Sequence, residues 1–143
     1  MQIDNVNKFI KMPNNLSTMT VDMIGIEYAR SYQMKIFFNY IYEFKKGVRQ
    51  MILQTINTKY LDIVTKRLEG RNIDYVIQDI GKNKFNVFFG NEACIKVVNK
   101  MIIGKTLTEL SPEEDFILGT MLGYDVCEQC SRYCHKKSLL RGV

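Results

Sequence analysis

The chain has 143 residues, of which 46% are hydrophobic, and its formal net charge at pH 7 is +5. This length suits one ordinary domain and not two, and the hydrophobic content excludes disorder of the whole chain. No apolar run approaches the roughly 20 residues that span a bilayer. The positive charges are scattered, without the block of like charges that is typical of a nucleic-acid arm. We therefore expect neither membrane nor nucleic acid as a partner, although the positive field favours an acidic one.

The expected compartment follows from the start of the chain and from its cysteines. The first residues show no basic start followed by an apolar block, so no export signal is predicted. Four cysteines in a chain without such a signal are interpreted as reduced thiols. A cytoplasmic protein is therefore expected.

Residues 1–33 carry no sustained hydrophobic period, and Met34 resembles a natural start. We interpret 1–33 as an extension that is poorly structured or peripheral, and 34–143 as a single domain. Residues Lys35–Tyr42 are β-branched and aromatic, which predicts a strand. The apolar spacing within Phe44–Ile56 then predicts a helix.

Next, Thr58 is expected to cap a second helix that ends at Gly70. Residues Ile73–Ile80 alternate and Lys84–Phe89 follows after a turn, which predicts a β-hairpin. These two strands follow the helices and complete the predicted sheet.

The C-terminal half is predicted to be helical. Asn91 is expected to cap a helix over Glu92–Ile102. Ser111, Pro112 and Glu114 together form the pattern of a capping box, with proline at the first helical position. Gly123 is the expected end of that helix, and a last helix is predicted over Asp125–Lys137.

The predicted order is β-α-α-β-β-α-α-α. This indicates an α/β protein of the α+β type, with a small three-stranded sheet that includes a β-hairpin, packed against about five helices in a split-βαβ arrangement. An open sheet edge needs cover, and a helix over Phe116–Met121 that is apolar on several sides needs more of it. We therefore expect a homodimer that uses this helix or the strand Lys35–Tyr42.

A cysteine cluster lies in the last predicted helix. Cys127, Cys130, Cys134 and His135 have the ligand types of a zinc site, but Cys127 and Cys134 lie two helical turns apart, about 10 Å. One zinc ion cannot reach both ends of that stripe, so a surface of small apolar residues is the favoured interpretation. A thiol or metal-binding protein remains an alternative. No cofactor is expected.

Other motifs are weaker signals of chemistry. Glu113, Glu114 and Asp115 suit a cation site or general acid–base work, but they also suit a helix N-terminus. The junction Phe88–Glu92 carries one glycine, which is a weak signal of an anion site. His135 is the only histidine, near the end of the chain, which makes a hydrolase improbable.

Three segments are similar to an uncharacterised bacterial family catalogued as a domain of unknown function: Ile41–Arg49, Phe88–Cys94 and the long stretch Leu110–Asp125. The resemblance covers roughly 100 of the 143 residues. It implies three strands, five helices and a homodimer, and an association with flavodoxins as genomic neighbours. It implies no catalytic residue and no cofactor.

The expected function is a non-enzymatic, homodimeric binding or regulatory module. The alternative is an accessory protein to flavodoxin-type electron transfer, since flavodoxins are usually acidic and this chain is basic. No catalytic residue is assigned. The candidate interface or binding residues are Tyr42, Glu43, Gly90, Asn91, Glu114, Asp115, Leu118 and Tyr124.

Overall fold

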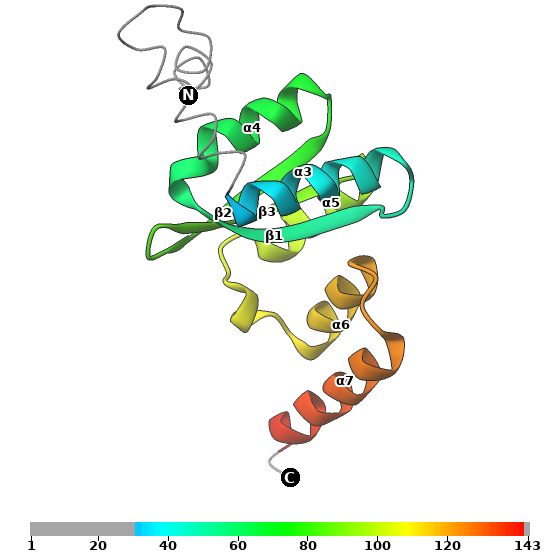
Figure 1. Ribbon diagram of the computed structural model, residues 1–143. Coiled ribbons are helices and arrows are strands. Elements are labelled where there is room, and N and C mark those ends of the chain that lie inside the picture. The colour runs from blue at the N-terminus through cyan, green and yellow to red at the C-terminus, as the bar shows by residue number, and fades with distance from the viewer. Residues whose placement is uncertain (1–30, 142–143) are drawn as a thin grey trace, which may run out of the picture.

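A computed structural model describes residues 31–141 (Figure 1). The expectation for residues 1–30 lies outside the described part of the chain. Two short 3-10 turns, η1 and η2, accompany five helices and three strands. In chain order the elements are α3 (Tyr32–Lys45), β1 (Met51–Asn57), η1 (Thr58–Tyr60), α4 (Leu61–Gly70), β2 (Asp74–Gly81), β3 (Lys84–Gly90), α5 (Glu92–Ile102), η2 (Leu107–Glu109), α6 (Pro112–Met121) and α7 (Val126–Leu140).

The prediction of a strand over Lys35–Tyr42 is wrong, because this segment is the body of helix α3. Its aromatic and β-branched residues favour a strand, but Met34, Phe37 and Ile41 recur at helical spacing and are buried on one side. The Ser31 side chain caps the helix by accepting a hydrogen bond from the Met34 amide at 3.4 Å. Ser31 therefore caps α3 and residues 32–33 belong to it, so the expected boundary before Met34 falls inside a helix.

The predicted helix over Phe44–Ile56 is also wrong, because strand β1 begins at Met51. Gly47 adopts a φ of +81° just after α3 and ends the helix. In β1 the buried Ile52 and Ile56 face one core, while Met51 faces the other. The spacing that resembled a helical stripe is thus divided between a helix end and a strand.

Helix α4 begins later than predicted. Thr58 opens the 3-10 turn η1, and the Asn57 side chain caps that turn by accepting from the Lys59 amide at 2.9 Å. The α-helix itself starts at Leu61 and ends at Gly70, as the glycine predicts. The chain therefore runs α-β-α-β-β-α-α-α, with the first two predicted elements exchanged in type.

The sheet has the order β1-β3-β2, and β3 pairs antiparallel with both neighbours. The two outer strands consequently run parallel to each other, joined by α4 and separated by β3, which is the predicted split-βαβ arrangement. The hairpin of β2 and β3 confirms the prediction from the alternating pattern. The α+β architecture is therefore confirmed, with three strands and five helices in residues 31–141.

Each face of the sheet has its own hydrophobic core, because successive side chains of a strand point to opposite faces. Helices α3 and α4 cover one face, where Phe37 meets Phe89 with ring centroids 5.6 Å apart. Helices α5 and α6 contribute to the core of the other face, which contains the buried Phe88 and Leu118. Figure 1 shows α6 and α7 on the side of the sheet away from α4.

The predicted starts of the helices in the C-terminal half are confirmed, and so are the ends of α5 and α6. The Asn91 side chain caps α5, and Ser111, Pro112 and Glu114 open α6 as a capping box. Gly123 follows α6 with a φ of +80°. The last helix begins one residue after the Asp125 cap and extends to Leu140, three residues beyond the predicted end. No helix in residues 31–141 is long and apolar enough to cross a membrane.

Candidate functional site

Helices α6 and α7 form a hairpin that approaches closely at Gly119. A Cβ atom at Gly119 would lie 2.1 Å from Gln129 Oε1, so the absence of a side chain at Gly119 makes room for the buried Gln129 side chain in its present position. About one turn along the same helix interface, the rings of Phe116 and Tyr133 pack edge to face with centroids 5.8 Å apart. These two contacts fix α7 across α6.

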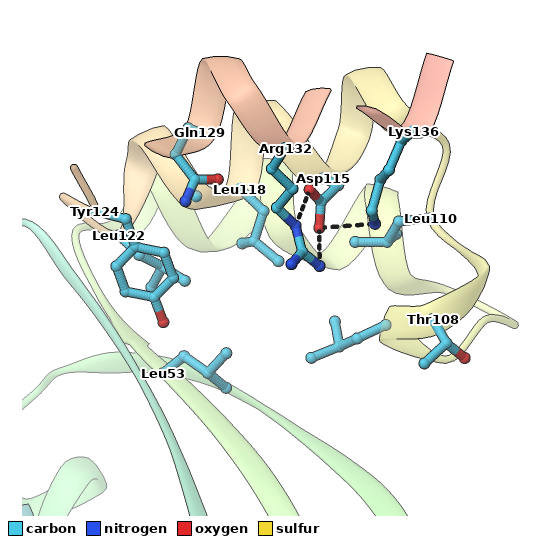
Figure 2. A pocket seen from close by; sticks show the side chains of 12 residues that line it. Leu53, Thr108, Leu110, Asp115, Leu118, Leu122, Tyr124, Gln129, Arg132 and Lys136 are labelled. Carbon is cyan, nitrogen blue, oxygen red and sulfur yellow. Dashed lines mark hydrogen bonds and ion pairs between the residues drawn. The ribbon is translucent and has the colours of Figure 1, made fainter. Parts of the chain in front are cut away.

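A cleft of about 400 Å³ lies between this hairpin, η2 and strand β1 (Figure 2). Its size falls within the range of small-molecule sites, about 300–1,000 Å³. Leucines form its apolar part, and polar side chains of α6, α7 and η2 form the remainder. The lining residues are Leu53, Leu107, Thr108, Leu110, Asp115, Leu118, Gly119, Leu122, Tyr124, Gln129, Arg132 and Lys136.

One wall of the cleft carries three charged groups. The Asp115 carboxylate accepts from Arg132 Nε at 2.7 Å and from Arg132 Nη2 at 3.2 Å. The Lys136 ammonium lies 3.4 Å from the same carboxylate. Burial alone would raise the pKa of Asp115, but the hydrogen bond and charge of Arg132 and the nearby Lys136 outweigh it and lower that pKa. The hydrogen bond to Asp115 likewise raises the pKa of Arg132. With two cations and one anion, this wall has a net positive charge.

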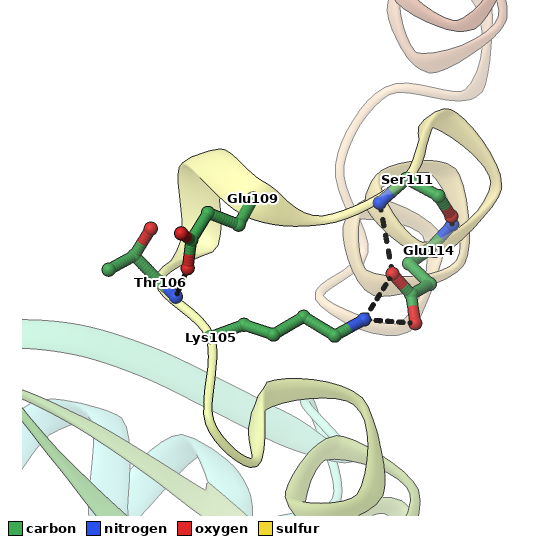
Figure 3. A network of polar contacts seen from close by, with 5 residues as sticks. All are labelled: Lys105, Thr106, Glu109, Ser111 and Glu114. Carbon is green, nitrogen blue, oxygen red and sulfur yellow. Dashed lines mark hydrogen bonds and ion pairs between the residues drawn. The ribbon is translucent and has the colours of Figure 1, made fainter.

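The start of α6 is held by a polar network (Figure 3). Glu114 accepts from the Ser111 amide at 2.9 Å and from the Lys105 ammonium through both carboxylate oxygens at 2.9 Å. The backbone hydrogen bond to Ser111 is the main cause that lowers the pKa of Glu114, followed by the bond from Lys105. Just before it, Thr106 and Glu109 form a second capping box around η2. The segment that connects α5 to α6 is therefore fixed both at η2 and at the start of α6.

The sheet contributes a row of hydrogen-bonded polar side chains. Thr55 Oγ1 donates to Asn86 Oδ1 at 2.6 Å, and Asn86 Nδ2 donates to Gln78 Oε1 at 2.9 Å. Gln78 Nε2 continues the row to the carbonyl of Lys105 at 3.1 Å. The row thus crosses all three strands and ties the sheet to the linker that leads into α6.

A comparison with protein families places this architecture. The model of the family described as "Protein of unknown function (DUF2023)" matches residues 35–136. The chain belongs to this family. No curated protein matches the chain. The match contains every residue that lines the cleft, from Leu53 to Lys136.

The segments that carried the resemblance to the DUF2023 family have distinct places in the fold. Ile41–Arg49 covers the end of α3 and the following turn, and Phe88–Cys94 covers the junction of β3 and α5. The longest segment, Leu110–Asp125, contains α6 and its caps, which form one wall of the cleft. The predicted membership in a family of unknown function is confirmed.

The structure brings three of the predicted candidate residues together. Asp115, Leu118 and Tyr124 all line the cleft. Leu118 is only 6% exposed and packs in the core between sheet and hairpin, so it is covered by its own chain. Tyr124, in contrast, is 51% exposed and its ring lies at one end of the cleft in Figure 2. Glu114 lies at the adjacent helix start and serves the capping box.

The other four candidates lie elsewhere. Tyr42 and Glu43 lie in the last turn of α3, which packs on the opposite face of the sheet. Glu43 accepts from Arg49 Nε at 2.6 Å and stabilises the turn after α3. Gly90 and Asn91 form the junction of β3 and α5, and the Asn91 side chain accepts from the Ala93 amide at 2.9 Å. These contacts give Glu43 and Asn91 structural roles.

The cysteine cluster faces away from the cleft. Cys127, Cys130 and Cys134 are free and exposed, and each lies two residues before one of the three cleft residues of α7: Gln129, Arg132 and Lys136. A shift of two residues rotates a helical position by about 200°. Among residues 31–141, no group of three or more histidine, cysteine or acidic side chains is placed to hold a metal ion.

The sequence interpretation missed Gln129, Arg132 and Lys136, which line the cleft from α7. Their spacing of three and four residues was a usable signal, because such residues share one helix face. The cysteines share the same spacing on the other face, and only their stripe of α7 was weighed as a ligand site from the sequence.

Proposed function

We propose that this protein is a non-enzymatic, homodimeric binding module of the bacterial cytoplasm, and that the cleft between β1, η2 and the α6–α7 hairpin is its binding site. The cleft carries the proposal, because it combines a leucine-lined part with charged and amide groups on fixed helices. The four free cysteines are consistent with a reducing compartment.

The electrostatics of the cleft favour binding over catalysis. A general base works best with a pKa near the operating pH. The pKa of Asp115 is instead lowered by Arg132 and Lys136, which outweigh the effect of its burial, and this makes its carboxylate a poor proton acceptor at neutral pH. His135 lies on the exposed side of α7 and does not line the cleft.

The proposed dimer uses the apolar surface that the α6–α7 hairpin leaves exposed. Leu118 and Leu122 are covered by the chain's own sheet, but Ile117 is 45% exposed and Val126 is 61% exposed. A second copy of the chain is the proposed cover for these side chains. The alternative prediction of a dimer through a strand over Lys35–Tyr42 does not stand, because that segment is helical.

Light scattering tests the dimer. We expect a mass of twice 16.7 kDa for the parent and a monomer for Ile117→Glu. Val48→Glu is the matched control, since Val48 is 69% exposed in the turn after α3, and it should stay dimeric. A parent that is monomeric at tens of micromolar rejects the dimer.

Mass spectrometry of the natively purified protein tests the binding function, and we expect a small molecule retained by the parent.

A second candidate function, an accessory to flavodoxin-type electron transfer, is favoured by the distribution of charge. Residues 31–71 contain eight lysines and arginines but three acidic residues, whereas residues 72–141 contain nine of each. The net charge of +5 thus resides in the segment that forms α3, β1 and α4. A basic segment of this kind favours an acidic protein partner.

Calorimetric titration with a flavodoxin at low and high salt tests this candidate. We expect salt-sensitive binding that is weakened by the double variant Lys35→Glu/Lys46→Glu. The control, Lys82→Glu/Lys100→Glu, changes the net charge equally outside residues 31–71 and should bind more tightly than the first variant. Absence of heat with flavodoxin at low salt rejects the candidate.

A further inference from the structure

We infer that the cleft binds a small carboxylate with an apolar body, whose head group pairs with Arg132 and Lys136 and whose body lies on the leucines. The inference rests on the proposed binding function and specifies the chemical class of its ligand. It follows from the free donors of the charged wall and from the position of the apolar side chains relative to them.

The first observation concerns the hydrogen bonds of the Arg132 guanidinium. Its Nε and Nη2 atoms donate to Asp115, which occupies one edge of the planar guanidinium. Within residues 31–141, Arg132 Nη1 has no hydrogen-bond partner, so the guanidinium edge that contains Nη1 is available to a ligand. Figure 2 shows the guanidinium reaching from α7 toward the cavity. Such an edge matches the two oxygens of a carboxylate.

The second observation is the position of Lys136. Its ammonium is 3.4 Å from Asp115, longer than the 2.7 Å contact that Arg132 Nε makes with the same carboxylate. Lys136 is one helical turn from Arg132, so both cations lie on the same helix face and line the same cleft. Asp115 neutralises one of the two cations, and one positive charge remains for a ligand anion.

The third observation is the apolar part of the same cleft. Leu53 of β1 is half-buried, and Leu118 and Leu122 of the hairpin line the cavity next to the charged wall. Figure 2 shows Leu53 facing the hairpin across the cavity. An apolar body lying there removes leucine surface from water, which stabilises the complex. A purely ionic ligand gains nothing from these contacts.

NMR titration of the full chain with octanoate, octan-1-ol and acetate tests the inference. We expect octanoate to shift the amides around the cleft with an affinity at least about tenfold higher than that of the other two probes. Lys136→Gln should weaken octanoate binding several-fold. Lys137→Gln is the matched control, because Lys137 pairs with Glu113 at 2.9 Å and does not line the cleft. It should bind octanoate like the parent.

Several outcomes overturn the inference. Equal binding of octan-1-ol shows that the charged wall does not recognise the head group, and equal binding of acetate shows that the leucines do not recognise the body. Octanoate shifts away from the cleft also overturn it. If octanoate fails but the purified protein retains another small molecule in the cleft, the ligand class is wrong and the proposed binding function stands. If neither binds, both fail.

Discussion

Gly90 lies where β3 passes into α5, and its substitution by alanine should be severely destabilising. Gly90 adopts a φ of +149°, a conformation in which residues with a Cβ atom are strained. An added Cβ would lie 2.3 Å from the Gln50 carbonyl oxygen and 2.8 Å from the Met51 Cα atom. Both contacts are with backbone, so no flexible side chain can move away.

The loss of stability on Gly90→Ala can be estimated from the backbone atoms that must move. The contact with the Gln50 oxygen must lengthen by about 0.7 Å to reach 3.0 Å, the shortest distance that real Cβ atoms show. That carbonyl accepts the Asn91 amide at 2.9 Å, and Met51 pairs with Gly90 in the sheet. Backbone strain of about 1–3 kcal/mol and the weakening of two hydrogen bonds, each about 1 kcal/mol, predict a loss of roughly 3–5 kcal/mol.

Urea unfolding followed by circular dichroism measures this loss, and two further glycines separate its causes. Gly104 has a φ of +72° with open space around its Cβ position, so Gly104→Ala should lose about 1 kcal/mol from strain alone. Gly70 ends α4 with neither strain nor contact, so Gly70→Ala should be neutral or stabilising by up to about 1 kcal/mol. A loss for Gly90→Ala no larger than that for Gly104→Ala would refute the steric argument.

Three further predictions concern caps and charges. Ser111→Ala should destabilise the fold by about 1 kcal/mol, the usual contribution of an N-cap; melting curves equal to the parent's would contradict it. A chain that starts at Met34 should unfold at lower urea than one that starts at Ser31, because the cap of α3 is lost; coincident curves would show that the cap contributes nothing. The lowered pKa values of Glu113 and Asp115 imply stability that is complete above their ordinary values of 4.5 and 3.8 and is lost as the pH falls through the lower folded-state values. Asp115→Asn should flatten this acid dependence, and a parent equally stable at neutral pH and at about pH 3 would contradict it.

The local signals of the C-terminal half were sufficient to predict its elements. Ser111 and Asn91 have side chains that satisfy the free amides of a helix start, and this chemistry acts within a few residues. The α3 segment was misassigned because its composition favours a strand, whereas burial of Phe37 and Ile41 against the sheet decided for a helix. Tertiary packing outweighed the local preference there.

The cleft lay beyond prediction for a related reason. It exists because α7 crosses α6 at Gly119 and because Leu53, distant in sequence, faces the hairpin from β1. The spacing of residues along a helix indicates which of them share a face, but it does not say what that face meets. Asp115 was singled out from the sequence, while its partner Arg132 lies 17 residues later.

The central position of β3 has a consequence for hydrogen exchange. Its backbone is paired on both sides, and residues Phe85 to Gly90 are all buried between the two cores. Its amides therefore exchange only when the whole domain opens. In α7, Gln129 is the one buried residue, so we expect this helix to open locally more often than the sheet. Amides of α7 should therefore exchange far faster than those of β3.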